Sequence, residues 1–520
     1  MIENDIWVIL AMLLYFILVI AIGFLYKNTS NKSSKSYFLG NRKLGPWVTA
    51  FSAEASDMSG WLLMGLPGVA YFTGASDAVW VALGLAIGTY LNWKFVAVRL
   101  RKYSQKANDS ITVPDFLSNR FGDTKKILMT ISAIIILIFF CIYVGSCFVT
   151  TGKLFNTLFG LDYTTMMIIG ALVVFLYTFV GGFLSVSTTD MVQGILMFFA
   201  LTVVFIGSVA AAGGIENTVS FLKSIPGFLS LNEMSAPVLG SGEHQIVENG
   251  QPVFGEPVQY TAIAIVSGLV WGLGYFGMPH ILVRFMGISH SKEVKTSRRI
   301  ATIWVVLSLF CAVSIGLVGR AVLPIEFLTQ SDAESVFVVL SQILLPSFVC
   351  GLVVSGIFAA TMSSSSSYLL LAGSAFANNI YKGLINKRAS DRSVLIVARI
   401  TLIAVLIFGI LISLDSESSI FAVVSYAWAG LGASFGPLIL CCLYWRRTNL
   451  QGAIAGMIVG AVTVLVWDGV VAPLGGIFAV YELLPGFVLS LFAIVIVSLV
   501  SKPPSEKVLE DFDTYMDLDV

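Results

Sequence analysis

Long apolar stretches follow one another along almost the whole chain, and polar residues gather in the segments between them. Each stretch extends for about twenty residues or more, which is the length that an α-helix needs to cross the hydrocarbon core of a bilayer. Transmembrane β-strands would instead alternate in polarity over about ten residues. The pattern therefore predicts an all-α polytopic membrane protein. Windows of about 19 residues give about 13 spans, at 5–26, 47–74, 77–98, 127–156, 163–181, 190–212, 259–287, 300–322, 346–378, 393–414, 418–443, 450–471 and 477–500.

The composition agrees with a membrane protein and excludes a water-soluble one. Hydrophobic residues make up 57% of the chain, against roughly 45–50% in a soluble domain. The 30 Lys and Arg residues balance the 30 Asp and Glu residues, so the net charge does not indicate a nucleic-acid partner. The sequence contains no P-loop, zinc motif or nucleophile–base pair. We therefore expect no enzyme activity, no cofactor and no obligatory protein partner.

Lysine and arginine are distributed unevenly among the segments between the spans. If the N-terminus lies outside, most of the 30 basic residues fall in cytoplasmic segments, which is the arrangement that the positive-inside rule favours. We therefore expect a multi-pass protein of the cytoplasmic (inner) membrane, with its N-terminus outside and its C-terminus in the cytoplasm. The first apolar run has no basic segment before it and no small-residue cleavage site, which indicates a retained helix and not a signal peptide.

The second span carries two acidic residues at membrane depth. Glu54 and Asp57 lie near Gly60, Pro67 and Gly68, and an ionisable group in hydrocarbon is costly enough to be a functional-site hypothesis. Glycine and proline loosen a helix, and an interrupted helix exposes backbone groups that coordinate a small cation or a charged end of a solute. The alternative is a face of small residues that packs against another helix.

The ninth span contains five consecutive serines, at 363–367, within an otherwise apolar helix. Oxygen ligands suit a hard, dehydrated cation, so we expect two of the five hydroxyls to take part in an ion site. The sequence alone leaves open which two. The alternative for each serine is a hydrogen bond back to its own helix.

The seventh span combines aromatic residues with glycines and a proline. Trp271 and Tyr275 are four residues apart and share a helix face, Phe276 follows them, and Pro279 removes one backbone hydrogen bond. Such a segment suits the wall of a pocket for a small ring or a cation. The alternative is an aromatic belt at the membrane interface, although belts lie at the ends of spans and this motif lies inside one.

The two interrupted spans are five spans apart and run in opposite directions, which is typical of an inverted repeat with its site near the bilayer midplane. This spacing predicts a first helix and loop, a core of two five-helix repeats, and two more helices. The expected parts are 1–46, the first repeat at 47–212, an external loop at 213–258 with a short helix, the second repeat at 259–445, two further helices at 446–500, and a short acidic tail at 501–520.

Two further polar residues lie near the cytoplasmic ends of spans. Asp190 opens the sixth span, where it acts either as an N-cap or in an ion pathway. Arg42 follows Gly40 in a cytoplasmic loop, and we favour a lipid or topology anchor over a gate.

Several of these segments together resemble the sodium/solute symporter family, and within it the sodium/proline permeases. The matching segments are 38–46, 55–68, which reads Ala-Ser-Asp-Met-Ser-Gly-Trp-Leu-Leu-Met-Gly-Leu-Pro-Gly, 271–284 and 359–363. The likeness runs from near the N-terminus through the last span. It implies the inverted-repeat fold of the sodium-coupled amino-acid transporters.

The resemblance also implies roles for particular residues of this chain. The family's sodium site corresponds to the backbone oxygens of Ala55, Met58 and Ala360 with the hydroxyls of Ser363 and Ser364. Asp57 matches the acid associated with sodium coupling. Ser59, Gly60, Tyr143, Trp271, Tyr275 and Pro279 match substrate-side positions, while Asp190 and Arg42 match accessory positions on the cytoplasmic side.

What the resemblance implies is import of L-proline across the membrane, with sodium as the coupling ion, by alternating access. Sodium would bind first, between the second and ninth spans, and so raise the affinity for the solute beside Trp271 and Tyr275. One alternative is a different cargo, such as another small amino acid, an osmolyte or a carboxylate. Another is a membrane sensor, for which the short tail offers no output domain.

Glu54 departs from the family pattern, because close relatives usually carry glycine there. It lies three residues before Asp57 and on nearly the same helix face. It is either neutral and buried, part of the solute path, or a reason to expect coupling to protons, and the sequence does not decide among these.

Overall fold

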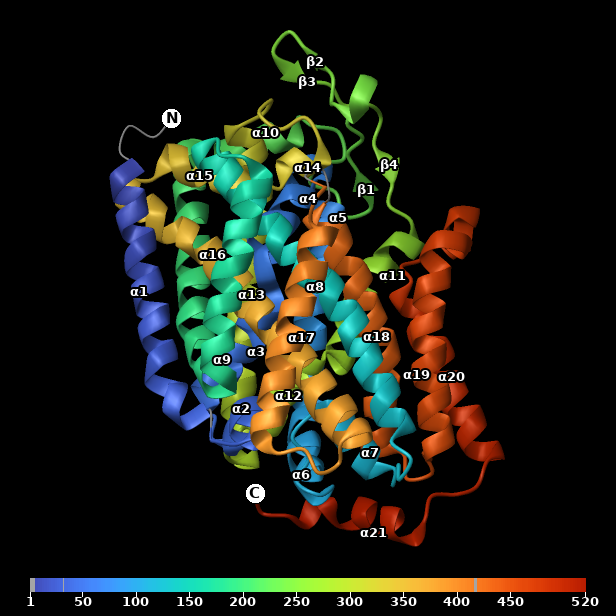
Figure 1. Ribbon diagram of the computed structural model, residues 1–520. Coiled ribbons are helices and arrows are strands. Elements are labelled where there is room, and N and C mark those ends of the chain that lie inside the picture. The colour runs from blue at the N-terminus through green and yellow to red at the C-terminus, as the bar shows by residue number, and fades with distance from the viewer. Residues whose placement is uncertain (1–4, 31, 416–418) are drawn as a thin grey trace.

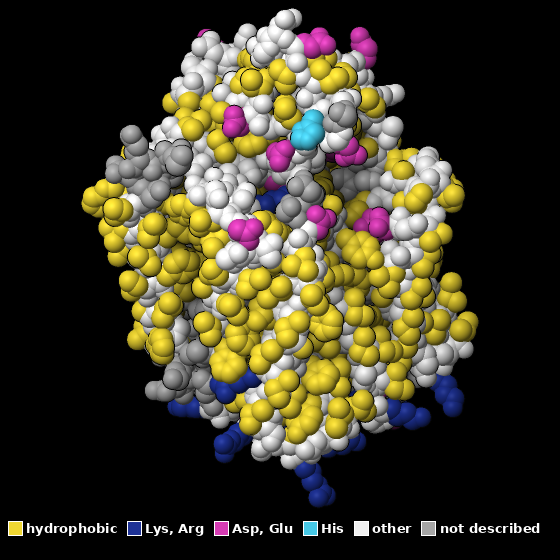
Figure 2. Space-filling view, turned by 45° about the horizontal axis from the view of Figure 1, so that its top comes forward, with side chains coloured by type: hydrophobic (Ala, Val, Ile, Leu, Met, Phe, Trp, Pro, Cys, Tyr) yellow, Lys and Arg dark blue, Asp and Glu magenta, His cyan; other side chains and the backbone are white. Residues whose placement is uncertain are grey.

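The computed structural model describes residues 5–30, 32–415 and 419–520, most of which lie in helices that run side by side (Figure 1). Figure 2 shows an apolar band around the visible face, with acidic side chains above it and basic side chains along the lower edge. We call these the acidic end and the basic end. A band of this kind is what a lipid bilayer requires of the surface it surrounds, so the predicted multi-span membrane protein is confirmed.

The number of spans is close to the prediction. Among the described residues, 10 helices are long and apolar enough to cross a membrane, or 11 if the bent pair Ala262–Gly277 and Pro279–Gly287 counts as one span. The predicted count of thirteen is therefore approximate. Tyr163–Leu176 forms a shorter apolar helix, and the second predicted span is divided by a break at Ser59.

The described part of the first half of the chain contains ten α-helices. They are α1 (Asp5–Ser30), α2 (Ser34–Leu39), α3 (Pro46–Gly60), α4 (Leu66–Thr73), α5 (Ala75–Asn92), α6 (Val98–Lys106), α7 (Val113–Arg120), α8 (Ile127–Phe159), α9 (Tyr163–Ala211) and α10 (Ile215–Lys223). Wider π-helical turns, Trp61–Gly65 and Trp93–Ala97, join α3 to α4 and α5 to α6. The long α9 bends at Gly182, where φ is 64°, so it covers the fifth and sixth predicted spans.

A cap of irregular chain follows α10 at the acidic end (Figure 1). It holds two antiparallel pairs of two-residue strands, β1 (Glu233–Met234) with β4 (Val258–Gln259) and β2 (Val247–Glu248) with β3 (Gln251–Pro252). The short helix expected in this loop is α10. Strands of two residues are too short to show an alternating pattern, and the sequence therefore gave no signal for them.

The second half begins with α11 (Ala262–Val270), a 3-10 segment (Trp271–Gly277) and α12 (Pro279–Gly287). Then follow α13 (Val294–Val322), α14 (Gln330–Ala333), α15 (Val336–Leu344), α16 (Ser347–Ser374) with its π-helical extension Ala375–Ile385, α17 (Asp391–Ile412), α18 (Ile420–Tyr444), α19 (Leu450–Val466), α20 (Leu483–Val500) and α21 (Glu506–Thr514). Figure 1 shows α1 and the α19–α20 pair at opposite edges of the bundle, and α21 beneath its basic end.

Both predicted helix breaks are present. In α3, Ser59 has φ 34°, a value that L-residues rarely adopt, and its hydroxyl accepts a hydrogen bond from the Trp61 backbone N–H at 3.2 Å. A Cβ on Gly60 would lie 2.3 Å from Cγ2 of Thr150, so only glycine fits this contact with α8. In the seventh span the axis bends by 45° before Pro279, the first residue of α12.

Glycines let the 3-10 segment lie directly on α5. A Cβ on Gly272 would be 2.2 Å from the carbonyl oxygen of Gly84 and 3.2 Å from Cα of Gly88. Because both neighbours are backbone, neither can move aside as a flexible side chain would. This contact fixes how close the broken seventh span comes to the third.

Replacing Gly272 by alanine should lower the stability of the fold by about 1–3 kcal/mol, because the added methyl group overpacks a contact between two backbones. The thermal unfolding midpoint in detergent, followed by tryptophan fluorescence, measures the effect. Gly45→Ala is the matched control, since a Cβ there meets nothing within 4 Å. Equal midpoints for the two variants would contradict the close approach.

Candidate functional site

The contact between α3 and α16 brings together three of the five residues of the expected ion site. The Ser363 hydroxyl donates to the carbonyl oxygen of Ala55 at 2.7 Å and to that of Ala360 at 3.0 Å. All three residues are fully buried. A helix break on one side and a serine on the other thus present several oxygen atoms to one point, the type of ligand that a hard cation prefers.

The other two expected ligands lie beside this contact. The Met58 carbonyl accepts the backbone N–H of Trp61 across the break. The Ser364 hydroxyl is fully buried and makes no hydrogen bond with the described residues. A buried hydroxyl without a partner has already lost its hydrogen bonds to water. The Ser364 oxygen can therefore bind a ligand without first breaking a hydrogen bond in the protein.

The remaining serines of the run have other partners. Ser365 and Ser366 donate to carbonyl oxygens of their own helix, those of Thr361 and Ser363. For these two residues the alternative of a hydrogen bond within the helix is therefore what the structure shows. Ser367 instead accepts a hydrogen bond from Arg284 at 2.6 Å.

Asp57 links the two broken helices. The Tyr275 hydroxyl donates to Oδ2 of Asp57 at 2.7 Å, and Nε2 of His280 lies 3.4 Å from Oδ1. All three side chains are buried. The carboxylate of the second span is therefore held by two side chains of the seventh.

A small cavity lies next to this carboxylate, with a volume of about 10 Å³. That is room for about one water molecule. The structure is therefore a closed form, and a solute as large as an amino acid requires the cavity to open. The lining residues are Asp57, Met58, Trp61, Leu85, Tyr143, Trp271, Val424 and Trp428.

Aromatic rings close the cavity on the side of the acidic end. Trp271 stacks on Trp61 with ring centres 5.5 Å apart and on Tyr481 at 5.4 Å, and Phe421 lies 5.2 Å from it. Trp428 donates from Nε1 to the Trp271 carbonyl oxygen at 2.8 Å. We call these five residues the aromatic wall. Trp271 is only 5% exposed, so the alternative of an interfacial belt is wrong for this residue.

A buried ion pair holds the N-terminal end of α18 in place beside the aromatic wall. Nζ of Lys153 lies 2.8 Å from Oε2 of Glu334. The same carboxylate accepts the backbone N–H groups of Ile420 and Phe421 at 3.1 and 3.2 Å, and the Ser419 hydroxyl at 2.9 Å. A carboxylate at the first turn satisfies free backbone donors there. It thereby fixes Phe421 in the aromatic wall.

Toward the basic end, a second buried network joins four helices. Arg284 on α12 donates to Oδ2 of Asp190 on α9 at 2.9 Å, to the Ser52 hydroxyl on α3 at 2.7 Å and to Ser367 on α16. Ser52 also donates to Asp190 at 2.7 Å. Of the two roles that the sequence left open for Asp190, the N-cap is not what the structure shows, because α9 is already helical well before this residue.

Arg42 is buried in protein and not exposed to lipid. Its guanidinium donates to Asp109 at 3.0 Å, to the Ser104 hydroxyl at 3.1 Å, and to the carbonyl oxygens of Ser110 and Met286. Of the two anchor roles favoured from the sequence, the lipid anchor is therefore wrong. Partial burial by itself raises the pKa of Asp109, but the hydrogen bonds from Lys35 and Arg42 outweigh it and lower that pKa.

Glu54 faces the third span and not the cavity. Its Oε1 accepts a hydrogen bond from Nε1 of Trp93 at 2.8 Å, and its Oε2 has no hydrogen-bond partner among the described residues. The side chain is 1% exposed. Of the three possibilities left open by the sequence, a place in the lining of the solute cavity is not what the structure shows.

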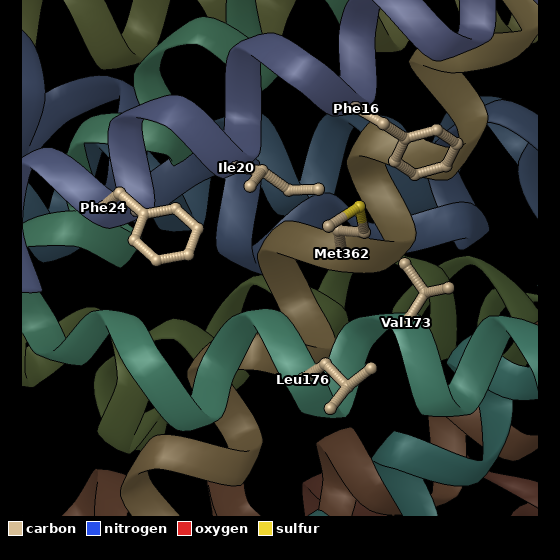
Figure 3. A pocket seen from close by; sticks show the side chains of 7 residues that line it. Phe16, Ile20, Phe24, Val173, Leu176 and Met362 are labelled. Carbon is tan, nitrogen blue, oxygen red and sulfur yellow. The ribbon is translucent and has the colours of Figure 1, made fainter.

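A second and larger pocket, shown in Figure 3, lies between α1, α9 and α16. Its lining differs in chemistry from that of the small cavity. Its volume is about 330 Å³, but the labelled side chains present only carbon and one sulfur atom. A zwitterion finds no polar partner in such a lining. This pocket is therefore not the candidate site. It is lined by Phe16, Ile20, Gly23, Phe24, Val173, Leu176 and Met362.

Some expected site residues lie apart from the cavity, and others were missed. Pro279 begins α12 and does not line the cavity, and Gly60 packs against Thr150. Arg284 was missed as a partner of Asp190, although a cation inside an apolar span is itself a signal. Trp428 was missed because the sequence pattern of a single tryptophan in an apolar helix is the same whether it lines a cavity or packs in the core.

Two broken helices that meet at buried oxygen atoms beside a cavity are typical of ion-coupled membrane transporters. The family model described as the sodium:solute symporter family matches residues 37–460. The chain belongs to this family, and it is a transporter and not an enzyme.

Curated relatives match the chain over almost its full length. The chain is 44% identical to the high-affinity proline transporter PutP of Bacillus subtilis (strain 168), over 95% of this chain and 98% of that protein. It is 41% identical to the osmoregulated proline transporter OpuE of the same organism, over 96% of each. It is 40% identical to the sodium/proline symporter of Escherichia coli (strain K12), over 95% and 93%.

Solved structures show the same fold at lower identity. A Na+-coupled sialic acid symporter, in a substrate-bound outward-open state, matches with a TM-score of 0.76 at 20% identity, over 96% of this chain and 99% of that one. MHP1, a nucleobase-cation-symport-1 family transporter in a closed conformation, matches with a TM-score of 0.53 at 13% identity, over 92% and 98%.

Trp93→Phe should destabilise the protein by about 1–3 kcal/mol, because it leaves a second oxygen of the buried Glu54 without a donor. The same change made in a Glu54→Ala background should cost less, since the carboxylate is then absent. Thermal unfolding of the four proteins in detergent forms a double-mutant cycle. A coupling energy of zero would mean that the hydrogen bond adds nothing.

Proposed function

We propose that the protein imports L-proline together with sodium ions by alternating access. The observation that carries this proposal is the position of the Ser363–Ala55 contact beside the cavity that Asp57 and Trp271 line. An ion site and a solute site so close together share the broken second span. Membership of the sodium:solute symporter family and relatives named proline transporters support both the ion and the cargo.

Sodium would bind between α3 and α16. The proposed ligands are the carbonyl oxygens of Ala55, Met58 and Ala360 and the hydroxyls of Ser363 and Ser364. The shared hydrogen of Ser363 would turn away from Ala55 so that both oxygens face the ion. Binding would stabilise the strained backbone at Ser59 in the form that accepts solute, and this difference in affinity between two states is what coupling requires.

Proline would bind in the opened cavity. Its ring would pack on Tyr143 and on Trp271 of the aromatic wall, while its charged ends would meet the backbone at Ser59 and Gly60 and the pair formed by Asp57 and Tyr275. Stacking of a ring on aromatic side chains is favourable without further polar contacts. Pro279 would contribute indirectly, by setting the bend of the seventh span.

The remaining expected residues would act on the basic side of the site. Asp190 would hold Arg284, and with it α12, in the closed form, and Arg42 would tie the loop after α2 to the end of α12. We further propose that the basic end faces the cytoplasm, and that 47–212 and 259–445 are the two inverted repeats. The Lys and Arg side chains along this edge of the visible face and the matching breaks in the second and seventh spans support these assignments.

Uptake of labelled L-proline into proteoliposomes, with and without an inward sodium gradient at fixed pH and membrane potential, tests the function. Ser363→Ala should raise the sodium concentration for half-maximal uptake at least about tenfold, because one ligand oxygen is lost. Ser355→Ala is the matched control, since this hydroxyl bonds only within α16, to Gly351 at 2.7 Å. Uptake that does not depend on sodium would refute the coupling ion, and absence of proline uptake would refute the cargo.

The orientation is tested by labelling single cysteines in right-side-out vesicles with a maleimide that does not cross membranes. Glu248→Cys, in the exposed β2 strand, should react at once, whereas Lys387→Cys, in the exposed loop before α17, should react only after the membrane is permeabilised. Five of the six native cysteines are buried, and the protein without added cysteine gives the background. The reverse order of labelling would invert the topology.

A further inference from the structure

The last segment of the chain, residues 505–520, lies across the basic end of the bundle and away from the candidate site (Figure 1). It contains α21 and a short 3-10 turn, Tyr515–Asp517. We call this segment the strap. The strap takes no part in the proposed binding of ion or solute. It nevertheless makes specific aromatic, hydrogen-bond and ion-pair contacts with the bundle, which a solvated tail would not make.

Tyr515 anchors the strap in the protein. Its ring lies flat on that of Tyr103 of α6, with centres 4.2 Å apart and planes inclined by 5°. Its hydroxyl donates to the Leu443 carbonyl oxygen of α18 at 3.0 Å and accepts from Arg99 of α6 at 2.7 Å. The residue is 1% exposed. One side chain of the strap thus joins α6 to the end of α18.

Phe512, three residues before Tyr515 and in the last turn of α21, forms a second anchor. Its ring lies 5.1 Å from the guanidinium of Arg120, which also lies 5.0 Å from the ring of Tyr103. Arg120 is 2% exposed and belongs to α7, which leads into α8. A buried guanidinium between aromatic faces is stabilised by them, so the strap covers a charge that would otherwise meet water or lipid headgroups.

Ion pairs complete the contact along the strap. Asp513 binds Arg446 through two hydrogen bonds of 2.8 Å, which lower the pKa of Asp513. Asp519 lies 2.9 Å from Lys292, and the Val520 carbonyl oxygen accepts the Ser291 backbone N–H at 2.7 Å. These pairs are exposed to solvent, so salt screens them strongly.

The strap joins the inner ends of helices that line the small cavity. Leu85 lies on α5, which continues into α6, and Val424 and Trp428 lie on α18. Tyr143 lies on α8, which follows α7. The strap is attached to both α6 and the end of α18, so these two helices cannot separate at the basic end without stretching or breaking its contacts.

We propose that the strap is a built-in brake on opening at the basic end, and that salt releases it. This inference rests on the proposed function for its transport readout. With the strap docked, opening requires the Tyr515 and Asp513 contacts to break or stretch, and the opening step is slow. When salt screens the ion pairs, the strap detaches from α6 and α18 more often, and opening at the basic end becomes faster.

The test compares maximal rates of proline uptake at saturating sodium in proteoliposomes. Asp513→Arg places a cation against Arg446 and should raise the maximal rate at least about twofold, with half-saturating proline unchanged. The double variant Asp513→Arg with Arg446→Asp restores the pair and should return the rate to that of the unchanged protein. Glu510→Arg is the matched control, an exposed acid of the same helix without an ion pair among the described residues. Higher KCl inside the vesicles should speed the unchanged protein and leave Asp513→Arg unaffected.

Two results would overturn the proposal. One is an unchanged rate and salt response in Asp513→Arg while the parent protein transports proline normally. The other is an equal acceleration by Glu510→Arg, which would show a general effect of charge. Hydrogen exchange of the backbone amides in 506–517 measures docking of the strap independently of transport. We expect these amides to be protected at low salt and to lose that protection at high salt. Rapid exchange at both salt concentrations would refute docking. Failure of proline uptake in the parent protein would refute the proposed function alone.

Discussion

The polar groups that this chain places inside the hydrocarbon layer can find partners only within the protein, because lipid offers none. Most backbone groups meet this requirement by forming helices. The exceptions are the breaks at Ser59 and before Pro279, where the regular ladder stops. These breaks lie in the most buried part of the bundle and face each other through Asp57 and Tyr275. The arrangement of the surrounding helices follows from the need to enclose them.

Enclosure is achieved differently on the two sides of the cavity. Toward the acidic end, rings stack on one another and the Lys153–Glu334 pair holds α18 over them. Toward the basic end, Arg284 draws four helices together through hydrogen bonds to charged and hydroxyl groups. A buried ion pair is weak evidence for stability, since desolvation offsets much of its attraction. We interpret both ion pairs as contacts that specify one arrangement of the helices. They can break and be replaced by other contacts when the helices rearrange.

Much of the fold could be predicted from the sequence, because span length and apolar composition are local properties. The breaks were also predictable from glycine and proline at membrane depth, and the serine run directed attention to α16, where the ion site is proposed. What local pattern does not contain is pairing between distant segments. It could not separate Ser363 from Ser365, since only contact with Ala55 distinguishes them. It misjudged Arg42 and left the role of Asp190 open for the same reason: their partners, Asp109 and Arg284, lie on other elements.

The contact between Gly60 and Thr150 has a consequence for how this family changes over time. The two residues come from α3 and α8, and a Cβ on Gly60 would lie 2.3 Å from the threonine side chain. A larger residue at position 60 is therefore tolerable only if position 150 becomes smaller in the same lineage. Substitutions at positions 60 and 150 should therefore occur together or not at all. The helix break at Ser59 thus restricts which residues α8 can carry at position 150, where α8 contacts neither the proposed ion site nor the cavity.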